Sequence, residues 1–180
     1  PKTGGQYTKL KDGDSFRLRV ISETPIIFWE WWTEDKKPLR VEYTGSLVKT
    51  PEGAKEGSKS KLVWAMTVYN YTNSQLEIWC VSQATIRDVL EWYIRDEDFG
   101  DPTKYDLKIS RTGSSMDDTK YSLAPLMKAE NMQPMSKDIL KEASQINLNA
   151  LITNENPFEV SEEAPEKKDT TETKIEDVPF

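Results

Sequence analysis

Aromatic and cationic side chains alternate through the first half of the chain, and this mixture suits binding of a single nucleic-acid strand. The candidate binding residues are Arg17, Arg19, Trp29, Trp31, Trp32, Lys36, Lys37, Arg40, Tyr43, Lys59, Lys61, Tyr69, Tyr71 and Trp79. Bases stack on aromatic rings for roughly 1–3 kcal/mol each. Cations along a groove neutralise phosphates, which makes such binding depend on salt. Aromatic rings also fill protein cores, and a surface for sugars or peptides has a similar composition.

Strand alternation separates some of these aromatic residues from the core. Trp64 shares a strand face with Leu62 and Val68, so we expect it to be a core residue. Trp29 and Trp31 have the opposite parity to Trp32. In an extended chain these three side chains point both ways, and at least one of them should be exposed. Outside this stretch, Trp92 lies off the apolar stripe of a predicted helix, and we expect it to be partly exposed.

The last residues of the sequence carry a second candidate site, for a protein partner. They are Glu176, Asp177, Val178, Pro179 and Phe180. Phe180 can fill an apolar pocket while its α-carboxylate and the two acidic side chains meet a basic rim. Pro179 limits the conformations lost on docking. A tail that only solubilises the protein has no need of an apolar end, so a docking peptide is predicted.

Composition excludes most catalytic schemes. The sequence has no His, the commonest general base and metal ligand. Cys80 is the only Cys, which excludes an internal disulfide and a multi-Cys zinc site, and it is interpreted as a small core or sheet residue. The carboxylates in 96–101 could hold Mg²⁺, but their place after a helix and around Gly100 favours a solvated loop. We therefore expect no enzymatic activity, no metal and no cofactor.

The overall charge is misleading about the folded part of the chain. The 180 residues carry 24 Lys and Arg and 31 Asp and Glu, for a net charge of −7. Nine acids and three lysines fall in 155–180, so this segment contributes −6 and the rest only −1. Within 36–61, seven bases face three acids. The acidic segment lacks the apolar residues that folding needs, and it is predicted to be disordered.

The pattern along the chain predicts a mainly β protein. Strands are expected at 15–21, 26–32, 40–48, 62–69, 76–81, 105–111 and 119–124, with a helix at 83–95 capped by Ser82 or Thr85 and a last helix at 136–151 capped by Ser136. One helix between strands suits a Greek-key barrel of the oligonucleotide/oligosaccharide-binding (OB) type. We expect this OB-fold domain in 1–125, a helical extension in 126–154 and the disordered acidic tail in 155–180. No apolar run is long enough to span a membrane, and no signal peptide is visible.

Two families resemble parts of this sequence. The end resembles the acidic tip of bacterial single-stranded DNA-binding proteins, which finish in Asp-Ile-Pro-Phe; here Val178 replaces Ile and one Asp fewer is present. Residues 10–125 resemble tailed-phage single-stranded DNA-binding proteins. The matching segments are Asp12-Gly13-Asp14, Pro25-Ile26-Ile27-Phe28-Trp29-Glu30 with Lys37-Pro38, 83–90, 96–102, Tyr105-Asp106-Leu107-Lys108-Ile109 and Thr119-Lys120-Tyr121.

The resemblance implies a protein that coats single-stranded DNA without strong sequence preference. Its tip is then expected to recruit replication, recombination or repair enzymes, and its acidic linker to contend for the DNA groove. Such a protein would act in the cytoplasm of an infected bacterial host. One short site per chain implies self-association or contacts between neighbours along the strand. The alternative is a non-catalytic adaptor that uses the same aromatic surface for a protein partner.

Overall fold

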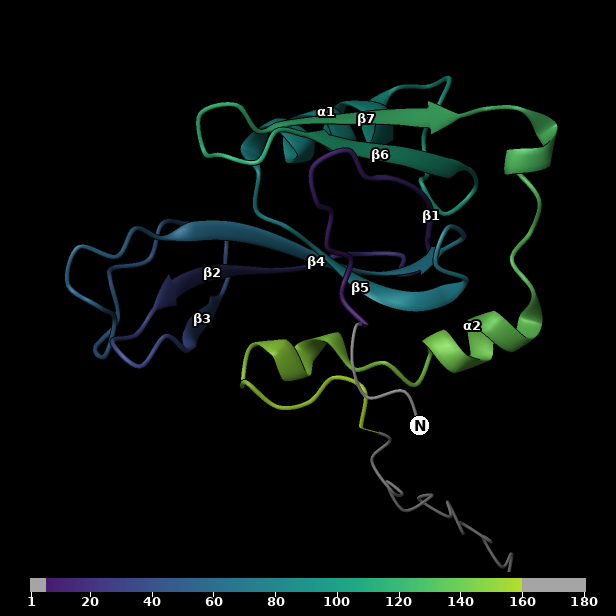
Figure 1. The fold of residues 1–180 in the computed structure, drawn as a ribbon. Coiled ribbons are helices and arrows are strands. Elements are labelled where there is room, and N and C mark those ends of the chain that lie inside the picture. The colour runs from purple at the N-terminus through teal and green to yellow at the C-terminus, as the bar shows by residue number, and fades with distance from the viewer. Residues whose placement is uncertain (1–5, 160–180) are drawn as a thin grey trace, which may run out of the picture.

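The computed structural model describes residues 6–159, and they form a mainly β structure (Figure 1). The elements in chain order are β1 (Ser15–Val20), β2 (Ile26–Trp32), β3 (Pro38–Glu42), β4 (Lys61–Asn70), β5 (Gln75–Val81), α1 (Ala84–Arg95), β6 (Asp106–Thr112), β7 (Lys120–Leu126), η1 (Ala129–Asn131), α2 (Lys137–Ala143) and η2 (Leu148–Leu151). The prediction of a mainly β fold with one helix between strands and a short C-terminal helix is confirmed. The docking tip and most of the acidic tail lie outside the described residues.

Strand β4 pairs with three other strands of the sheet. One edge pairs first with β2 and then with β1, while the other edge pairs with β5; β6 and β7 continue the sheet beyond β1. The chain bends at Glu23 and Thr24 between β1 and β2, and Pro25, which cannot donate to the ladder, follows the bend. Beyond this bend, β2, β3, the start of β4 and the loop 43–60 extend to one side of the molecule (Figure 1). We call this part the arm.

The described strands form an open sheet and not a barrel closed by strand pairing. Within 6–159, the strand order ends at β7 on one side, and no ladder joins β7 to β5. Helix α1 contacts both of these strands and lies beside β7 in Figure 1. Its buried residues are Ile86 and Leu90, whereas Val89 and Ile94, which have the i+3 and i+8 spacing from Ile86 of one helix face, are 37% and 42% exposed. The helix therefore covers the sheet with a narrower stripe than its periodicity predicts.

Apolar residues on the two faces of β4 belong to two different cores. Met66 and Val68 pack with α1 and the buried faces of β1 and β6. Val63 and Ala65 point to the other face, since side chains alternate along a strand, and pack with η2. Because both faces are covered, β4 has more buried residues than a half-exposed strand.

The C-terminal extension is an integral part of the second core. Leu148 and Leu151 of η2 pack against Phe28 of the arm. Ser136 caps α2 as predicted, because its hydroxyl accepts from the Ile139 N–H at 3.3 Å. The predicted continuous helix over 136–151 is wrong: α2 ends at Ala143, and a turn leads to η2.

Two further local predictions are wrong. The strand expected at 40–48 is β3, which ends at Glu42, because the chain then turns back as the loop of the arm. Helix α1 begins after Gln83, and no side chain caps its first turn, so neither Ser82 nor Thr85 has the predicted role.

Candidate nucleic-acid interface

One face of the arm carries partly exposed aromatic side chains. In the antiparallel register, Trp29 lies opposite Val41 and Leu62, and Ile27 lies opposite Trp64. Paired residues project to the same side of a sheet. These five side chains therefore share one face, and none of them is fully buried. Trp64 also packs against the first core, in agreement with its predicted core position.

Tyr43 extends this surface. Its ring centroid lies 6.1 Å from that of Trp29, at an interplanar angle of 64°. The Trp29 indole Nε1 donates to the carbonyl of Ser46, 3.3 Å away in the loop that follows. We call Trp29, Tyr43, Trp64, Ile27, Val41 and Leu62 the aromatic face.

The C-terminal extension covers the opposite face of the arm. Arg40 Nε is 2.9 Å from a Glu30 carboxylate oxygen, and its Nη1 donates to the Leu151 carbonyl at 2.8 Å. The Arg40 guanidinium also lies 5.1 Å from the Phe28 ring centroid. Arg40 thus joins the extension to the arm, and its role as a DNA contact stays a prediction.

Three other candidate residues are buried, so the prediction that they lie on an exposed surface is wrong. Trp31 is 1% exposed, at the end of β2 where the Lys55 N–H of the arm loop donates to the Trp32 carbonyl. Trp79 is 3% exposed because it lies opposite Met66 on the face of the first core.

Arg19, the third of these, is 2% exposed and neutralises a buried carboxylate. Its Nε lies 2.7 Å from Asp106, which is itself inaccessible to solvent. The remaining guanidinium nitrogens donate to carbonyls of Asn131 and Gln133, at 2.8 and 3.0 Å. An unpaired buried carboxylate is strongly unfavourable, so Arg19 has a structural role and its guanidinium is not on the surface.

Arg17 and two tyrosines form a separate group at the other end of the sheet. Arg17 also pairs with Asp106, at 2.7 Å, but its side chain is 41% exposed and its guanidinium lies 4.1 Å from the Tyr71 ring centroid. Burial, and then the Asp106 charge, raise the pKa of the Tyr71 hydroxyl. The Tyr69 ring centroid is 5.0 Å from that of Tyr71.

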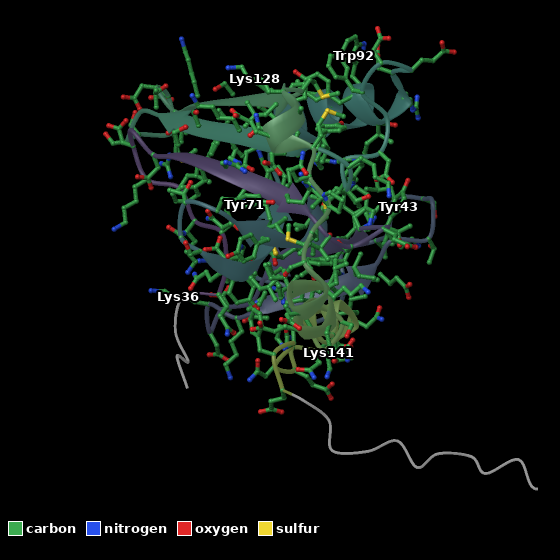
Figure 2. All side chains as sticks on the ribbon, turned by 90° about the vertical axis from the view of Figure 1, so that its right-hand side faces the viewer. Lys36, Tyr43, Tyr71, Trp92, Lys128 and Lys141 are labelled. Atoms are coloured by element: carbon green, nitrogen blue, oxygen red, sulfur yellow. The ribbon has the colours of Figure 1, made fainter. Side chains whose placement is uncertain are left out.

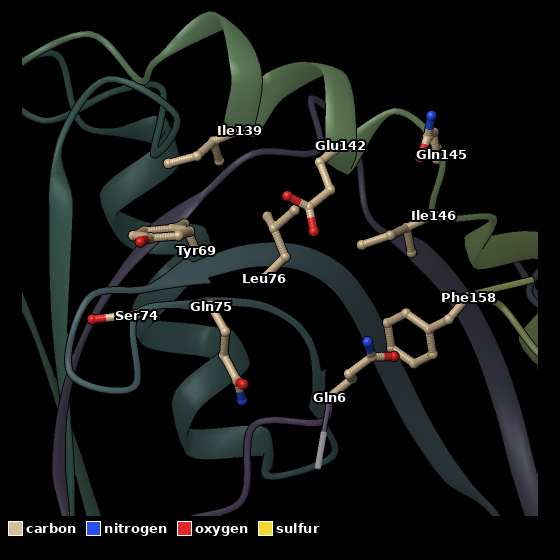
Figure 3. A pocket seen from close by; sticks show the side chains of 10 residues that line it. All are labelled: Gln6, Tyr69, Ser74, Gln75, Leu76, Ile139, Glu142, Gln145, Ile146 and Phe158. Atoms are coloured by element: carbon tan, nitrogen blue, oxygen red, sulfur yellow. The ribbon is translucent and has the colours of Figure 1, made fainter. Parts of the chain in front are cut away.

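Tyr69 faces a pocket and not the aromatic face. This pocket, of about 480 Å³, lies between the β4–β5 hairpin and the extension, and Leu76, Ile139, Ile146 and Phe158 contribute its apolar lining (Figure 3). The pocket belongs to the side of the sheet that α2 covers. Tyr69, Tyr71 and Arg17 are therefore not brought together with the residues of the arm.

The remaining candidates are exposed on the arm. Trp32 is 43% exposed, and Lys36, Lys37, Lys59 and Lys61 are all exposed. Lys61 lies opposite Glu30 in the register, so it projects from the face that does not carry Trp29. Trp32 has the opposite parity to Trp29 and projects from that same side. The exposed cations thus surround the arm and do not form a single stripe beside the aromatic face.

A cationic pocket near the start of α1 was not among the predicted sites. It measures about 650 Å³, and Arg111, Lys120 and Tyr121 line it together with Gln83 and Thr85. The Arg111 guanidinium lies 5.7 Å from the Tyr121 ring centroid, and its Nη1 donates to the Leu10 carbonyl. Its buried Nε has no hydrogen-bond partner in the described part of the chain. Two bases, one at each end of the segment between the predicted strands 105–111 and 119–124, were the available sequence signal.

The electrostatics of this pocket favour an anion. The first turn of α1 has no acidic residue and no side-chain cap. The free N–H groups of a helix N-terminus carry a partial positive charge that attracts anions. Together with Arg111 and Lys120, they give this pocket a positive potential that suits a phosphate.

Buried ionisable groups elsewhere stabilise the fold. Glu77 is 1% exposed, and burial alone would raise its pKa, but hydrogen bonds from Asn70, Asn73, Gln75 and Thr8 hold the pKa below its usual value. Burial raises the pKa of the Cys80 thiol to about 11, so the thiol is protonated near neutral pH.

The acidic segment after α1 is ordered by its own carboxylates. The Asp98 N–H donates to an Asp96 side-chain oxygen, and the Thr103 N–H and hydroxyl donate to Asp101. Among residues 6–159, no cluster of three or more Cys, Asp or Glu side chains is arranged to hold a metal ion. Within the same range, no helix has the length and hydropathy needed to span a membrane.

The described surface therefore offers one open aromatic face on the arm and one anion-binding pocket at the start of α1. Comparison of the chain with family models, curated proteins and solved structures found no match.

Proposed function

We propose that this protein binds single-stranded DNA and coats it without strong sequence preference during phage DNA replication, recombination or repair. The observation that carries the proposal is the aromatic face, which stays partly exposed while the extension covers the opposite side of the same strands. Rings that served only the core would be expected inside it. Partly exposed Trp and Tyr side chains provide stacking platforms that accept any base.

The anion-binding pocket lies beyond one end of the aromatic face. Val81 of β5 is opposite Trp64, and Gln83, which lines the pocket, follows two residues later. Two extended residues span at most about 7 Å, so Gln83 lies near the Trp64 end of the face. A strand whose bases stack on Trp29 and Tyr43 would then continue past Trp64 toward Arg111 and Lys120.

The order of the strands supports an OB-type barrel. Along the path β5-β4-β1-β6-β7, a three-stranded meander leads through one helix into a closing hairpin. We infer that α1 takes the place of direct pairing between β5 and β7. OB folds bind oligonucleotides through their strand face and the loops beside it, which correspond here to the arm and the β6–β7 turn.

The recruiting role rests on sequence alone. Glu176, Asp177, Val178, Pro179 and Phe180 lie outside the described residues, and their acidic and apolar pattern supports docking of replication, recombination or repair enzymes. The resemblance to phage proteins and a single free Cys support the cytoplasm of an infected bacterial host as the place of action.

Titration with oligo-dT tests the proposal through intrinsic tryptophan fluorescence. Stacking on Trp29 should quench the emission, and added salt should reverse the quenching because phosphate contacts release counterions. A signal that does not change at low salt would refute DNA binding at this face. It would instead favour the alternative, an adaptor that presents the aromatic face to a protein.

A further inference from the structure

The outer side of α1 carries an exposed aromatic ring that the described fold does not cover. Trp92 is 58% exposed, and Val89, one turn earlier on the same side of the helix, is 37% exposed. The Trp92 ring packs against Tyr93 and Phe99, whose centroids lie 5.4 and 6.1 Å away, and these two rings also contact each other. The ring is thus held in place before a partner arrives, so docking on it costs little side-chain entropy. A large, exposed and well-supported ring is a typical feature of a protein–protein contact.

Two carboxylates flank Trp92 along the helix. Asp88 lies one turn before the ring and Asp96, the C-cap residue, one turn after it, and both line a shallow hollow of about 440 Å³ beside the ring. Neither takes part in an ion pair in the described part of the chain, whereas Glu91 in the same hollow pairs with Arg95. Because that pair is neutral overall, the negative charge of the hollow comes from the two flanking carboxylates.

The charge of this surface favours a cationic protein segment over DNA. Five acids and two arginines fall in 84–98, for a net charge of −3, and such a surface repels phosphates. Figure 2 shows Trp92 at the top of the molecule, apart from Tyr43 of the aromatic face. A partner on α1 therefore leaves the aromatic face open.

The geometry of α1 also restricts the backbone of the partner. A helix bonds its own N–H and C=O groups internally, so the middle of α1 offers only side chains to a partner. A second helix satisfies its own backbone groups and can lie along α1. Asp88, Trp92 and Asp96 follow an i, i+4, i+8 stripe, which separates the two carboxylates by about 12 Å. The complementary helix has cations at i and i+8 and an apolar residue at i+4 between them.

We propose that the outer side of α1 binds a basic amphipathic helix of a partner protein. The central apolar residue of this helix packs on Trp92 and Val89, and the two cations beside it meet Asp88 and Asp96. Their stems lie along the Trp92 ring while their charged heads reach the carboxylates. The contact is small, so it is weak and reversible unless a second contact adds to it. The proposal is separate from the proposed function, since neither requires the other.

Two peptides of identical composition test the proposal on the full chain. Each is a capped, fluorescein-labelled Ala-Gln helix of about 18 residues with one central leucine. The matched peptide has an arginine four residues before and four residues after the leucine, on the same face. The isomer has the arginines two residues before and two after, on the other side of the helix. The acids of 155–180 attract both peptides equally, because their charges are the same. Measured by fluorescence anisotropy at low salt, the matched peptide should bind about tenfold more tightly.

Substitutions on α1 locate this preference. Asp88→Asn/Asp96→Asn removes two charges while keeping the side-chain shape, and Trp92→Ala removes the ring, so each should abolish most of the preference. Glu97→Gln/Asp98→Asn makes the same charge change beside the stripe and should keep the preference as the matched control. None of these side chains is buried, so the variants should fold like the wild type, which circular dichroism checks.

Equal affinity of the wild-type protein for the two peptides, or no binding of either peptide at low salt, would overturn the inference. A preference that persists in Trp92→Ala or in Asp88→Asn/Asp96→Asn would overturn it as well, because the stripe would then not be the site. The same conclusion would follow if the control variant lost the preference to the same extent.

Discussion

Replacement of Trp29 by alanine should weaken binding of single-stranded DNA. Trp29 is half-buried, its ring packs at 64° against Tyr43 and its indole N–H is bonded to Ser46, so the ring is held in place while part of it stays exposed. Stacking contributes roughly 1–3 kcal/mol per base. Because the ring is partly covered, we expect the lower part of this range, about 1–2 kcal/mol. This corresponds to an affinity about 5- to 30-fold lower.

The assay must not depend on the tryptophan that is removed. Fluorescence anisotropy of a labelled oligo-dT at low salt measures the affinity of each variant directly. Trp79→Phe is the matched control, because Trp79 is 3% exposed in the first core. This variant should unfold more readily than the wild type and yet bind DNA with unchanged affinity while it is folded.

Folded Trp29→Ala that binds oligo-dT within twofold of the wild type would contradict a stacking role for Trp29. In that case the bases stack elsewhere, and the exposure of the aromatic face has another cause. The stacking role would also be contradicted if Trp79→Phe, once shown to be folded, lost as much affinity as Trp29→Ala.

The other predictions concern stability and recruitment. The pKa of Glu77 in the folded protein lies below its usual 4.5. The ionised carboxylate therefore contributes its full stabilisation above pH 4.5, and this stabilisation is lost as the pH falls through the folded pKa. Glu77→Gln should flatten the acid limb of a series of thermal-unfolding curves recorded at different pH values. Arg19→Ala leaves Asp106 without its more buried partner and should lower the free energy of unfolding by about 3–5 kcal/mol, as measured with urea; a loss below 1 kcal/mol would contradict the buried pairing. Deletion of Val178–Phe180 should leave DNA affinity nearly unchanged but abolish capture of replication or repair enzymes in pull-downs, and unchanged capture would refute the docking role.

Local patterns in the sequence predict most of the elements. Alternation over 15–20 places β1, the extended aromatic stretch at 26–32 places β2, and the apolar spacing of Ile86 and Leu90 places α1, because each signal lies within the element itself. The alternation of β4 also predicts that Met66 and Val68 share a face. The alternation does not reveal that the other face of β4 is covered, since the residues of the extension that cover this face lie about 80 positions later.

The candidate site was harder to predict because exposure depends on distant partners. Arg19 has the pattern of an outward-facing cation, and only Asp106, 87 positions away, explains its burial. Trp31 and Trp29 have the same parity on β2, yet only Trp29 remains partly exposed. Arg111 and Tyr121 form a pocket with the start of α1 only after β6 and β7 have paired. Each of these outcomes follows from tertiary packing, which a periodic pattern does not encode.

The central claim is that single-stranded DNA follows the aromatic face of the arm toward the pocket of Arg111. Ultraviolet cross-linking of the full chain to oligo-dT, followed by mass spectrometry of the peptides, locates the bound strand directly. We predict cross-links at Trp29 and Tyr43, with Tyr121 as a further site. Cross-links confined to Tyr69 or Trp92, or a complete absence of cross-links under conditions that saturate the protein with DNA, would contradict the account.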